Sequence, residues 1–594
     1  MGVPKLKKFV SSSKGWDTIQ VSGKVVIDGN SLCYNLNKQH EWKFGGDYKD
    51  FYETVTVYIR ELKALGIEPY IVVDGMDHDD SKYQTYIARN EDRINRIAIS
   101  QSRGTTPHNV VRPLFTQTVF VDAVRDSKTK FFVADGEADR DIALLANSLS
   151  CPVISEDSDF FIFNIEAGYI PLNGDDQQTR IDLQKPVKRY QYKEFDESFS
   201  LNQEQRLFFP FILGNDFHNG AKQSSLQLTS RTPLHAIARK LSTLDFSDAT
   251  LTQFVCPNPI SQMEKIKLYY RGTAQSFDDL TSTSSLLELY PHTPEWIMQE
   301  YKNGRFMAPI MSLATCPTTK RWRHTIVVED FSQQSAWKIT EIAKKFIIGA
   351  LLGDEANKHH IMATAVKTSD KPSSHHRHRI QSYPSVTRVD SKLLLMDTEV
   401  ILAPKHTTIL SVPLKDVPQV PVTARKEIMY RVFHYTEPAE SDIPEGLQLA
   451  MIAGRCWVRK VACDNTHLIQ SLVCCILTCY GHFQMIDRKY GCKLAQHEIL
   501  FFLHSYAQWQ CLLHHVIAFN QVLSHPFPYT SPARLFSSSL LLHFYQQTSQ
   551  VLQEKMDTLA TSMLQIITES KYSTESLKDI ELEPSQTKKR RTTY

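Results

Sequence analysis

The chain has 594 residues, which is too many for one hydrophobic core, so about two to four folding units are expected. Hydrophobic residues at 42% and charged residues at 22% are ordinary for a globular protein, and composition excludes little else. The 67 Lys and Arg residues nearly balance the 65 Asp and Glu residues, at a net charge of +2, so any nucleic-acid contact must come from local basic patches.

The start of the chain and its cysteines indicate a reducing intracellular compartment. MGVPKLKKFV lacks the continuous apolar stretch of a signal peptide, and the eleven cysteines have no disulfide-framework spacing. Cys474, Cys475 and Cys479 lack zinc-ligand spacing and are expected to pack inside an apolar helix. The strongly apolar stretch around Leu472 to Tyr480 is about half the roughly 20 residues that cross a bilayer, so no membrane contact is expected.

The N-terminal third alternates short strand-like runs with helical stretches. The expected strands are Lys24–Ile27, Tyr70–Val73, Lys130–Val133 and Pro152–Ser155. Between the first two, Phe51–Leu65 carries apolar residues at helical spacing and predicts a covering helix. The fold class is therefore α/β, with a parallel sheet flanked by helices.

A basic helical face is expected in the stretch SKYQTYIARNEDRINRIAIS. Its four basic residues are Lys82, Arg89, Arg93 and Arg96. At about 100° per residue they fall within roughly 60° of arc, so they can hold a phosphate backbone. The neighbouring Tyr83 and Tyr86 can stack on unpaired bases. A charged helical face is also often simply solvated, and the sequence leaves both interpretations open.

After about residue 220 helical patterns dominate, so the C-terminal region is expected to be mainly α-helical. The clearest helical runs are 296–301, 336–352, 494–523 and 533–567. Residues 368–391 are rich in Ser, Pro, His and charge without apolar periodicity, which predicts a flexible linker. Residues 573–594 end in KKRRTTY and are expected to form a disordered basic tail, which either directs nuclear import or only adds solubility. The predicted division is a core at 1–220, a helical extension at 221–367, the linker, a helical region at 392–572 and the tail.

Seven acidic residues follow the expected strands or open the next helix. They are Asp28, Asp74, Glu137, Asp139, Asp157, Asp159 and Asp216. Ligands of open parallel sheets bind beyond the carboxyl ends of the strands, so these side chains can meet in one crevice. A lone strand-end Asp is usually a turn residue or a helix cap, whereas an ordered set of seven is far more specific.

Such a set of carboxylates calls for cations. Two carboxylates about 4 Å apart repel by roughly 1 kcal/mol in water and by about 4 kcal/mol at an effective dielectric of about 20. Oxygen ligands without neighbouring His or Cys suit Mg²⁺ or Mn²⁺ and disfavour zinc. Two Mg²⁺ ions, with Mn²⁺ as a substitute, would activate a water and stabilise the leaving oxygen of a phosphodiester. The acids therefore predict a two-metal phosphodiesterase.

These motifs resemble, in order and rough spacing, those of the flap-endonuclease/XPG family of structure-specific nucleases. DGEADRDIALLA followed by SEDSDFFIF is similar to the family's GEAEA and EDxD metal motifs, MGVPKLKKFV to its MGIxGL start, and ILGNDF to its LLGxDY. The resemblance implies a PIN-like, flap-endonuclease-type fold with all seven acids on metal-ligand positions, although Asp139 stands where these nucleases usually have Glu. It also implies that residues of about 78–125 form an arch, in which Lys82 and Arg89 keep the spacing of the catalytic Lys and Arg.

Two later segments are similar to the asteroid branch of that family. They are PEWIMQEYKNGRFMAPIMSLAT at 294–315 and YAQWQCLLHHVIAFNQVLSHPFP at 506–528. The resemblance implies a nuclear endonuclease that acts on single-stranded DNA and 3′ overhangs in double-strand break repair, with DNA-repair proteins as partners of the C-terminal helices. The alternative is a silent nuclease fold that serves as a scaffold for DNA binding or epidermal growth factor receptor signalling.

One segment departs from the family's pattern. Where flap endonucleases have a GIG-type helix-turn-helix that grips duplex DNA, this chain reads HNGAKQSSLQLTSRTPLHAIARKL, a degenerate form of that motif. The change favours a substrate that is recognised through its single strand.

Overall fold

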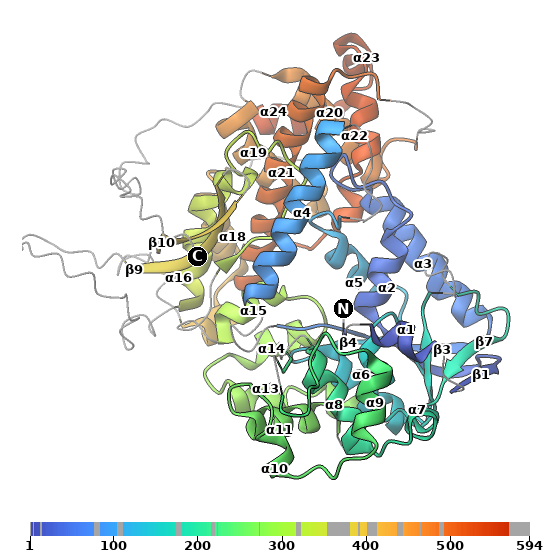
Figure 1. The fold of residues 1–594 in the computed structure, drawn as a ribbon. Coiled ribbons are helices and arrows are strands. Elements are labelled where there is room, and N and C mark those ends of the chain that lie inside the picture. Colours follow the sequence, from blue (N-terminus) through green and yellow to red (C-terminus); the bar gives the residue numbers. More distant parts are fainter. Residues whose placement is uncertain are drawn as a thin grey trace, which may run out of the picture.

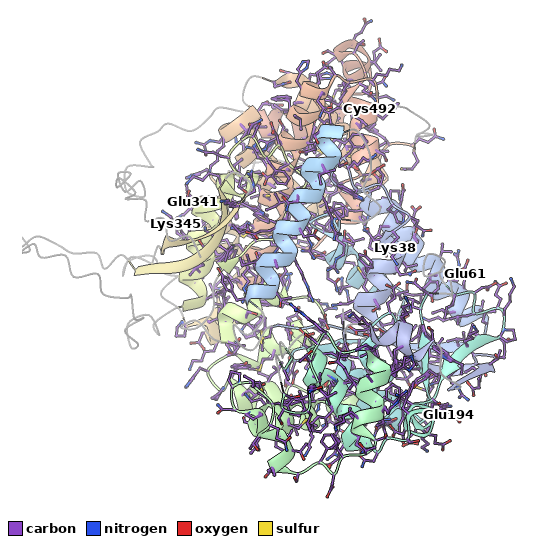
Figure 2. The ribbon with its side chains drawn as sticks, viewed as in Figure 1. Lys38, Glu61, Glu194, Glu341, Lys345 and Cys492 are labelled. Carbon is purple, nitrogen blue, oxygen red and sulfur yellow. The ribbon has the colours of Figure 1, made fainter. Side chains whose placement is uncertain are left out.

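A computed structural model describes most of the chain. The described residues are 2–3, 5–11, 15–76, 83–103, 111–173, 181–215, 220–221, 224–271, 274–315, 322–352, 381–389, 392–400, 413–435, 443–462, 465–485 and 492–568. They form an α/β body with helices around it, in the lower part of Figure 1, and a mainly helical C-terminal body above it. Figure 2 marks Glu194 in the first body and Cys492 near the far end of the second.

The central sheet has seven strands in the order β1-β7-β6-β5-β2-β3-β4. Its strands are β1 (Trp16–Ile19), β2 (Gly23–Asp28), β3 (Ile67–Val73), β4 (Lys130–Val133), β5 (Val153–Ser155), β6 (Tyr169–Pro171) and β7 (Val187–Tyr190). The five strands from β6 to β4 are parallel, whereas β7 and β1 pair antiparallel at one edge. The α/β class and the four expected strands are confirmed, and the antiparallel edge is an addition to the expected parallel sheet.

The sheet is buried on both faces, which explains why its central strands read as continuous apolar runs. Val25, Ile27 and Ile71 belong to one hydrophobic core, while Val26 and Val72 belong to the other. Successive side chains of a strand point to opposite faces, so this alternation places one core on each side of the sheet. The helices of this body are α1 (Leu6–Val10), α2 (Gly29–Asn37), α3 (Tyr48–Ala64), α4 (Tyr83–Arg103), α5 (Thr116–Asp126), α6 (Ala138–Ser148) and the 3₁₀ turn η1 (Ser158–Phe161). Helices α3 and α5 contribute to the first core, and α1 and α6 to the second.

A helical extension follows the sheet. It contains α7 (Tyr192–Phe199), α8 (Gln203–Leu213), α9 (Leu234–Leu241), α10 (Asp248–Leu251), α11 (Pro259–Tyr270), α12 (Phe277–Thr281), α13 (Ser284–Leu289), α14 (Glu295–Lys302) and α15 (Ala308–Thr315). Apolar residues of α8, α9 and α11 join the core that α6 covers, whereas those of α13, α14 and α15 join the other core, so the extension contributes to both cores.

The C-terminal body is built around one long helix, α21 (Gln496–Val522). Its other elements are β8 (Trp322–Arg323), η2 (Ala336–Thr340), α16 (Glu341–Leu352), β9 (Gln381–Val389), β10 (Lys392–Val400), η3 (Leu414–Gln419), α18 (Val422–Val432), η4 (Glu445–Leu447), α19 (Gln448–Trp457), η5 (Val458–Ala462), α20 (Thr466–Tyr480), η6 (Pro532–Arg534), α22 (Ser538–Tyr545), α23 (Ser549–Glu554) and α24 (Thr558–Thr568). Helix α21 is buried on nearly all sides, as expected of a helix that is apolar all round. The three cysteines of α20 are buried, which confirms their predicted packing role.

The expected linker at 368–391 is wrong for residues 381–389, which form β9. This strand pairs antiparallel with β10 and parallel with β8. Arg388 on β9 is buried and forms an ion pair of 2.9 Å with the buried Glu329. The sequence did not predict this strand, because a charged pair and not an apolar pattern holds it in place. The first part of the linker, 368–380, and the tail at 573–594 lie outside the described residues.

The two bodies dock through buried polar contacts as well as apolar packing. Asp47 Oδ1, at the start of α3, accepts hydrogen bonds from Ser537 Oγ at 2.8 Å and from the backbone N–H of Ser539 at 2.8 Å. Tyr48 OH donates to Gln510 Oε1 of α21 at 2.8 Å. The C-terminal body therefore covers part of α3. In the described part of the chain no helix is long and apolar enough to cross a membrane.

Candidate metal and nucleic-acid site

The described acids of the predicted set lie at the carboxyl ends of four neighbouring strands. Strand β2 ends at Asp28, β3 is followed by Asp74, β4 leads into α6 with Glu137 at its N-cap, and β5 leads into η1 with Asp157 at its N-cap. These strands are adjacent and parallel in the order β5-β2-β3-β4, so their ends lie side by side. Asp216 lies outside the described residues.

Asp28 is held by donors from two elements. Its Oδ1 accepts the backbone N–H groups of Asn30 at 2.9 Å and Ser31 at 3.0 Å, which makes it the N-cap of α2. Its Oδ2 accepts from Ser155 Oγ at 2.6 Å, at the end of β5. The carboxylate is only 5% exposed and is fixed between the two central strands.

Asp74 is held at the N-terminus of α6. Its Oδ1 accepts the backbone N–H of Ala138 at 3.0 Å, and its Oδ2 accepts a hydrogen bond from Asn30 Nδ2. Unpaired N–H groups and the helix dipole favour a negative charge at this end of a helix. Because Glu137 and Asp139 occupy the cap and the first turn of the same helix, three acids gather there.

The start of the chain packs on Asp157 and Asp159. Asp157 Oδ1 accepts the backbone N–H of Asp159 at 3.0 Å, and Asp159 Oδ1 accepts the backbone N–H of Val3 at 2.8 Å. Gly2 has a φ of +86°, and a Cβ atom on it would lie 2.0 Å from Asp157 Oδ1. A glycine is therefore required at this position both for its backbone conformation and for space.

The acids act on one another electrostatically. The pKa of Asp139 is raised well above its ordinary value, first by burial and then by the charges of Asp157, Asp28, Asp74 and Asp159. Carboxylates held this close disfavour each other's charged form, and a bound cation would relieve their repulsion. Their oxygen donors fit a hard divalent ion such as Mg²⁺. Within the described ranges, no group of three or more His, Cys, Asp or Glu side chains is already arranged to hold a metal ion, and several of these oxygens accept hydrogen bonds from protein donors instead.

Two tyrosines that the sequence did not reveal also bind the acids. Tyr269 OH donates to Asp139 Oδ2 at 3.0 Å, and Tyr270 OH donates to Asp159 Oδ2 at 2.9 Å. Asn215 Nδ2 lies 3.3 Å from Tyr270 OH and donates to it. Both tyrosines end α11, so the helical extension contributes directly to the site.

A third tyrosine ties two strand ends together. Tyr301 of α14 is fully buried, donates through its hydroxyl to the carbonyl of Ala134 at 2.9 Å, and accepts the backbone N–H of Met76 at 2.6 Å. Met76 follows β3 and Ala134 follows β4, so this hydroxyl fixes the spacing of the loops that carry Asp74 and Glu137.

The expected basic helix is α4, and its arginines form a cluster. The pKa of Arg93 is lowered to about 10 by burial and by the charges of Arg112, Arg89 and Arg96. Arg112, which precedes α5 and was not singled out in the sequence, also hydrogen-bonds the thiol of Cys33 on α2, the helix that Asp28 caps. The cluster thus reaches from α4 to α2. Lys82 lies outside the described residues.

Tyr83 and Tyr86 have protein neighbours. Tyr86 OH donates to the carbonyl of His324 at 2.7 Å, and the Arg323 guanidinium lies 5.1 Å from the centre of its ring. The same guanidinium lies 5.8 Å from the ring of Tyr83. Helix α4 also contacts the C-terminal body through Gln101 Nε2, which donates to the carbonyl of Glu329 at 2.9 Å, and it lies along that body in Figure 1. Base stacking on these two tyrosines stays a prediction.

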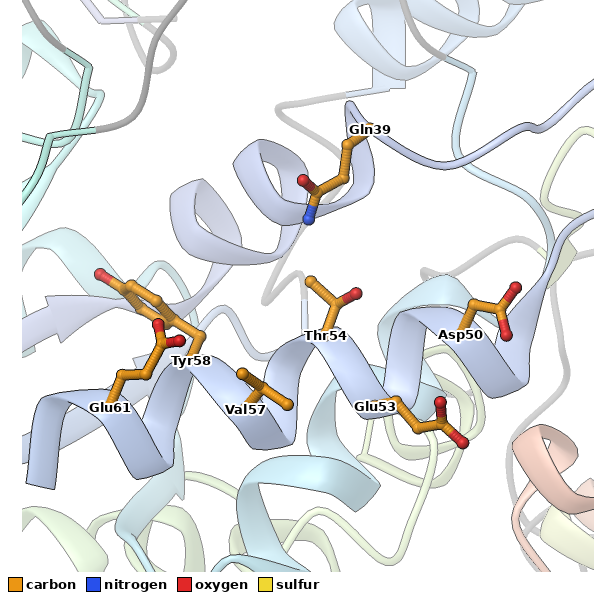
Figure 3. A pocket seen from close by; sticks show the side chains of 7 residues that line it. All are labelled: Gln39, Asp50, Glu53, Thr54, Val57, Tyr58 and Glu61. Carbon is orange, nitrogen blue, oxygen red and sulfur yellow. The ribbon is translucent and has the colours of Figure 1, made fainter. Parts of the chain in front are cut away.

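A wider hollow of ≈ 380 Å³ lies against α3, away from the residues predicted for the site (Figure 3). Its lining includes three carboxylates, those of Asp50, Glu53 and Glu61, and none of the strand-end acids. We therefore assign the candidate site to the strand ends and not to this hollow.

Comparisons with known proteins support this assignment. A model of the XPG I-region matches residues 128–216, a span that contains five of the seven acids, and a model of the asteroid N-terminal domain matches residues 499–580. Single-strand DNA endonuclease ASTE1 of Homo sapiens is 25% identical over 615 residues, which is 92% of this chain and 86% of that protein. Protein asteroid of Drosophila melanogaster is 39% identical over 154 residues, which is 25% of this chain and 17% of that protein. Among solved structures, the catalytic core of Rad2 in complex with DNA substrate covers 46% of this chain and 88% of its own at 16% identity and a TM-score of 0.32. The two family models and the curated relatives confirm the resemblance to the asteroid branch of the XPG-type nucleases.

Proposed function

We infer that this chain, a relative of the asteroid proteins that carries an XPG I-region, is a structure-specific DNA endonuclease. The observation that carries this conclusion is the gathering of strand-end acids around Asp139 inside the I-region. The carboxylates gathered there are costly to keep together, and a scaffold has no need for them. Nucleases with this region generally use divalent metals, and the oxygen donors here fit them.

In the proposed mechanism most metal binding comes from four acids of the I-region. They are Glu137, Asp139, Asp157 and Asp159. Asp28, Asp74 and Asp216 complete the inner and outer shells. When bound, two Mg²⁺ ions, or Mn²⁺ in their place, would lower the pKa of an attacking water and stabilise the leaving oxygen of the phosphodiester.

The rest of the site keeps these acids oriented before substrate arrives. Ser155 holds Asp28, the first N–H of α6 holds Asp74, and the tyrosines of α11 hold Asp139 and Asp159. Side chains that are already in place need no reorganisation during the reaction, and preorganised charges stabilise a transition state for this reason. The proposed role of these donors is to present carboxylate oxygens to the metal while excluding alternative rotamers.

The arginine cluster of α4 is proposed to bind the DNA backbone. Lys82 and Arg89 would stabilise charge on the scissile phosphate, and Arg93, Arg96 and Arg112 would hold neighbouring phosphates. Single-stranded DNA and 3′ overhangs are the proposed substrates, because the chain lacks the family's usual helix-turn-helix sequence for gripping duplex DNA. We further propose a nuclear role in double-strand break repair, with repair proteins as partners of the C-terminal body.

The test is cleavage of labelled single-stranded, 3′-overhang, 5′-flap and duplex DNA by purified protein with Mg²⁺ or with EDTA. Asp157→Ala and Glu137→Ala are expected to abolish Mg²⁺-dependent cleavage with an unchanged circular dichroism spectrum. Glu197→Ala, which removes an exposed carboxylate of α7, is the matched control and is expected to cleave like the wild type. Wild-type rates in both site variants would exclude the mechanism, and a wild-type protein that binds DNA without cutting any substrate would favour the scaffold.

Binding has its own test, because phosphate contacts are salt-dependent. Arg93→Gln is expected to weaken the affinity for single-stranded DNA uniformly across sequences and to reduce the slope of log affinity against log salt by about 0.7 for one lost phosphate contact. Arg239→Gln, an exposed arginine on α9, is the control. Equal salt slopes for Arg93→Gln and the wild type would remove Arg93 from the interface.

A further inference from the structure

A second, smaller pocket lies behind the tyrosines of α11, and the proposed cleavage mechanism does not use it. Its volume is ≈ 120 Å³, and it forms where one side of α6, the start of α8 and the end of α11 meet. Its polar lining residues outside the tyrosines are Arg140, Asn147, Asn164, Gln203 and Arg271. Along α6 the lining residues recur at positions 140, 143, 144 and 147, so a full face of that helix forms one wall.

The lining of this pocket is positively charged. It contains the guanidinium groups of Arg140 and Arg271 and no carboxylate. Among the described residues, Arg140 Nε and Arg271 Nε are both buried and have no hydrogen-bond acceptor. Glu204 Oε1 lies 3.4 Å from Arg271 Nη2, but Glu204 is not part of the lining and also pairs with Lys267. Buried N–H donors without acceptors are unfavourable, so these two Nε groups and the positive charge of the lining favour an anion in the pocket.

The size and walls of the pocket limit what the anion can be. The rings of Phe163, Tyr269 and Tyr270 form an aromatic wall, with ring centres of Phe163 and Tyr270 4.7 Å apart. Asn147 is already engaged, because its Nδ2 donates to the carbonyl of Asn164 at 2.7 Å. The volume is below the roughly 300 Å³ of a pocket for a drug-sized ligand, yet several times the roughly 30 Å³ that one water occupies in the liquid. A tetrahedral oxyanion fits this space, whereas a whole nucleotide does not.

We propose that this pocket binds a phosphate group between Arg140 and Arg271, separated from the strand-end acids by the rings of Tyr269 and Tyr270. Guanidinium groups bind phosphate oxygens with good geometry, since each presents several N–H donors in one plane. The phosphate comes either from a DNA backbone, in which case this inference rests on the proposed function, or from free inorganic phosphate, in which case it does not. In both cases the occupant lies against the two tyrosines whose hydroxyl groups orient Asp139 and Asp159.

The experiment measures binding without metal, so that cleavage plays no part in it. Isothermal titration with sodium phosphate, at constant ionic strength in EDTA, is performed on the full-length wild type, Arg140→Gln, Arg271→Gln and the exposed control Arg239→Gln. The same four proteins are titrated with a short thymidine oligonucleotide that has no terminal phosphates. Arg140→Lys is added because it keeps the charge but loses the planar donor group, and circular dichroism verifies that each variant is folded.

The wild type and the control are expected to bind inorganic phosphate alike, with at least a tenfold loss of affinity in each Gln variant and a smaller loss in Arg140→Lys. If the oligonucleotide also loses affinity in Arg140→Gln and Arg271→Gln but not in the control, the bound phosphate belongs to nucleic acid. If only inorganic phosphate is affected, the ligand is the free anion. Wild-type affinity of both folded Gln variants for both ligands would overturn the proposal, and this outcome is independent of whether Asp157→Ala abolishes cleavage.

Discussion

Replacing one acid of the site, Asp139, should stabilise the protein while destroying its response to metal. Asp139→Asn keeps the shape of the side chain and an oxygen for Tyr269 OH, but it removes a charge that burial and four neighbouring acids disfavour. In EDTA near neutral pH we therefore expect a larger free energy of unfolding than in the wild type. Substitutions of most other polar residues in a folded protein lower the free energy of unfolding instead.

Asp141, one turn into the same helix, supplies the magnitude and the matched control. Its pKa is raised from 3.8 to about 6 by burial and by Asp135. The folded protein binds the proton more tightly than the unfolded chain, so stability is highest below pH 3.8 and falls as the pH rises toward 6. This shift of about two pKa units corresponds to about 1.4 kcal/mol per unit. Asp141→Asn, which carries no charge, should therefore be roughly 3 kcal/mol more stable than the wild type at neutral pH.

The two substitutions should differ in their response to Mg²⁺. At a concentration of about 100 times the dissociation constant, a ligand that binds only the folded state adds about 2.7 kcal/mol to stability. The wild type and Asp141→Asn are expected to gain this amount, and Asp139→Asn is expected to gain little. Urea denaturation of all three proteins with EDTA and with MgCl₂ measures the difference. A destabilised Asp139→Asn in EDTA, or one that gains the full Mg²⁺ increment, would refute the electrostatic account of the site.

Two further predictions concern stability in the C-terminal body and at its junction with the α/β body. Burial lowers the pKa of His514 to about 4, so the stability that its neutral ring contributes is complete above pH 6.5 and is lost as the pH falls toward 4. Between pH 7 and pH 5 the free energy of unfolding should therefore fall by about 2 kcal/mol more in the wild type than in His514→Phe, as measured by denaturation at both pH values. Equal losses in the two proteins would contradict this cause. Asp47→Ala removes the acceptor of Ser537 Oγ and the Ser539 N–H and should cost about 1–3 kcal/mol, less in Asp47→Asn, which keeps one oxygen. Equal stability of Asp47→Ala and the wild type would show that this junction contributes nothing.

The central sheet could be predicted because its strands are buried on both faces. Continuous runs such as Lys24–Ile27 and Lys130–Val133 cannot alternate with polar residues when helices cover each side. The acids could be predicted for a related reason, since each follows a strand whose end is visible in the sequence. The two antiparallel strands β1 and β7 were not predicted because they are four residues long and half-exposed, without an apolar run.

The supporting residues of the site could not be predicted. Tyr269 lies 130 residues from Asp139 and Tyr270 lies 111 residues from Asp159, and no local pattern links them. Arg112 is an isolated basic residue before a helix, and Tyr301 lies in an amphipathic helix of the extension. The three tyrosines are brought to the site by the packing of the extension against the sheet, which is a property of the whole fold. A weak signal exists only for the tyrosine pair, as two adjacent hydroxyl groups at the end of a helix.

The hydrogen bond between Tyr48 and Gln510 spans 462 residues of chain. A ribosome that adds about 5–20 residues per second needs roughly 20–90 s to synthesise that interval. For this time the apolar side of α3 that the C-terminal body later covers remains exposed on the nascent chain. We therefore expect newly made protein to depend on chaperones until synthesis is nearly finished, and transcripts that stop before α21 to yield aggregation-prone fragments rather than a smaller nuclease.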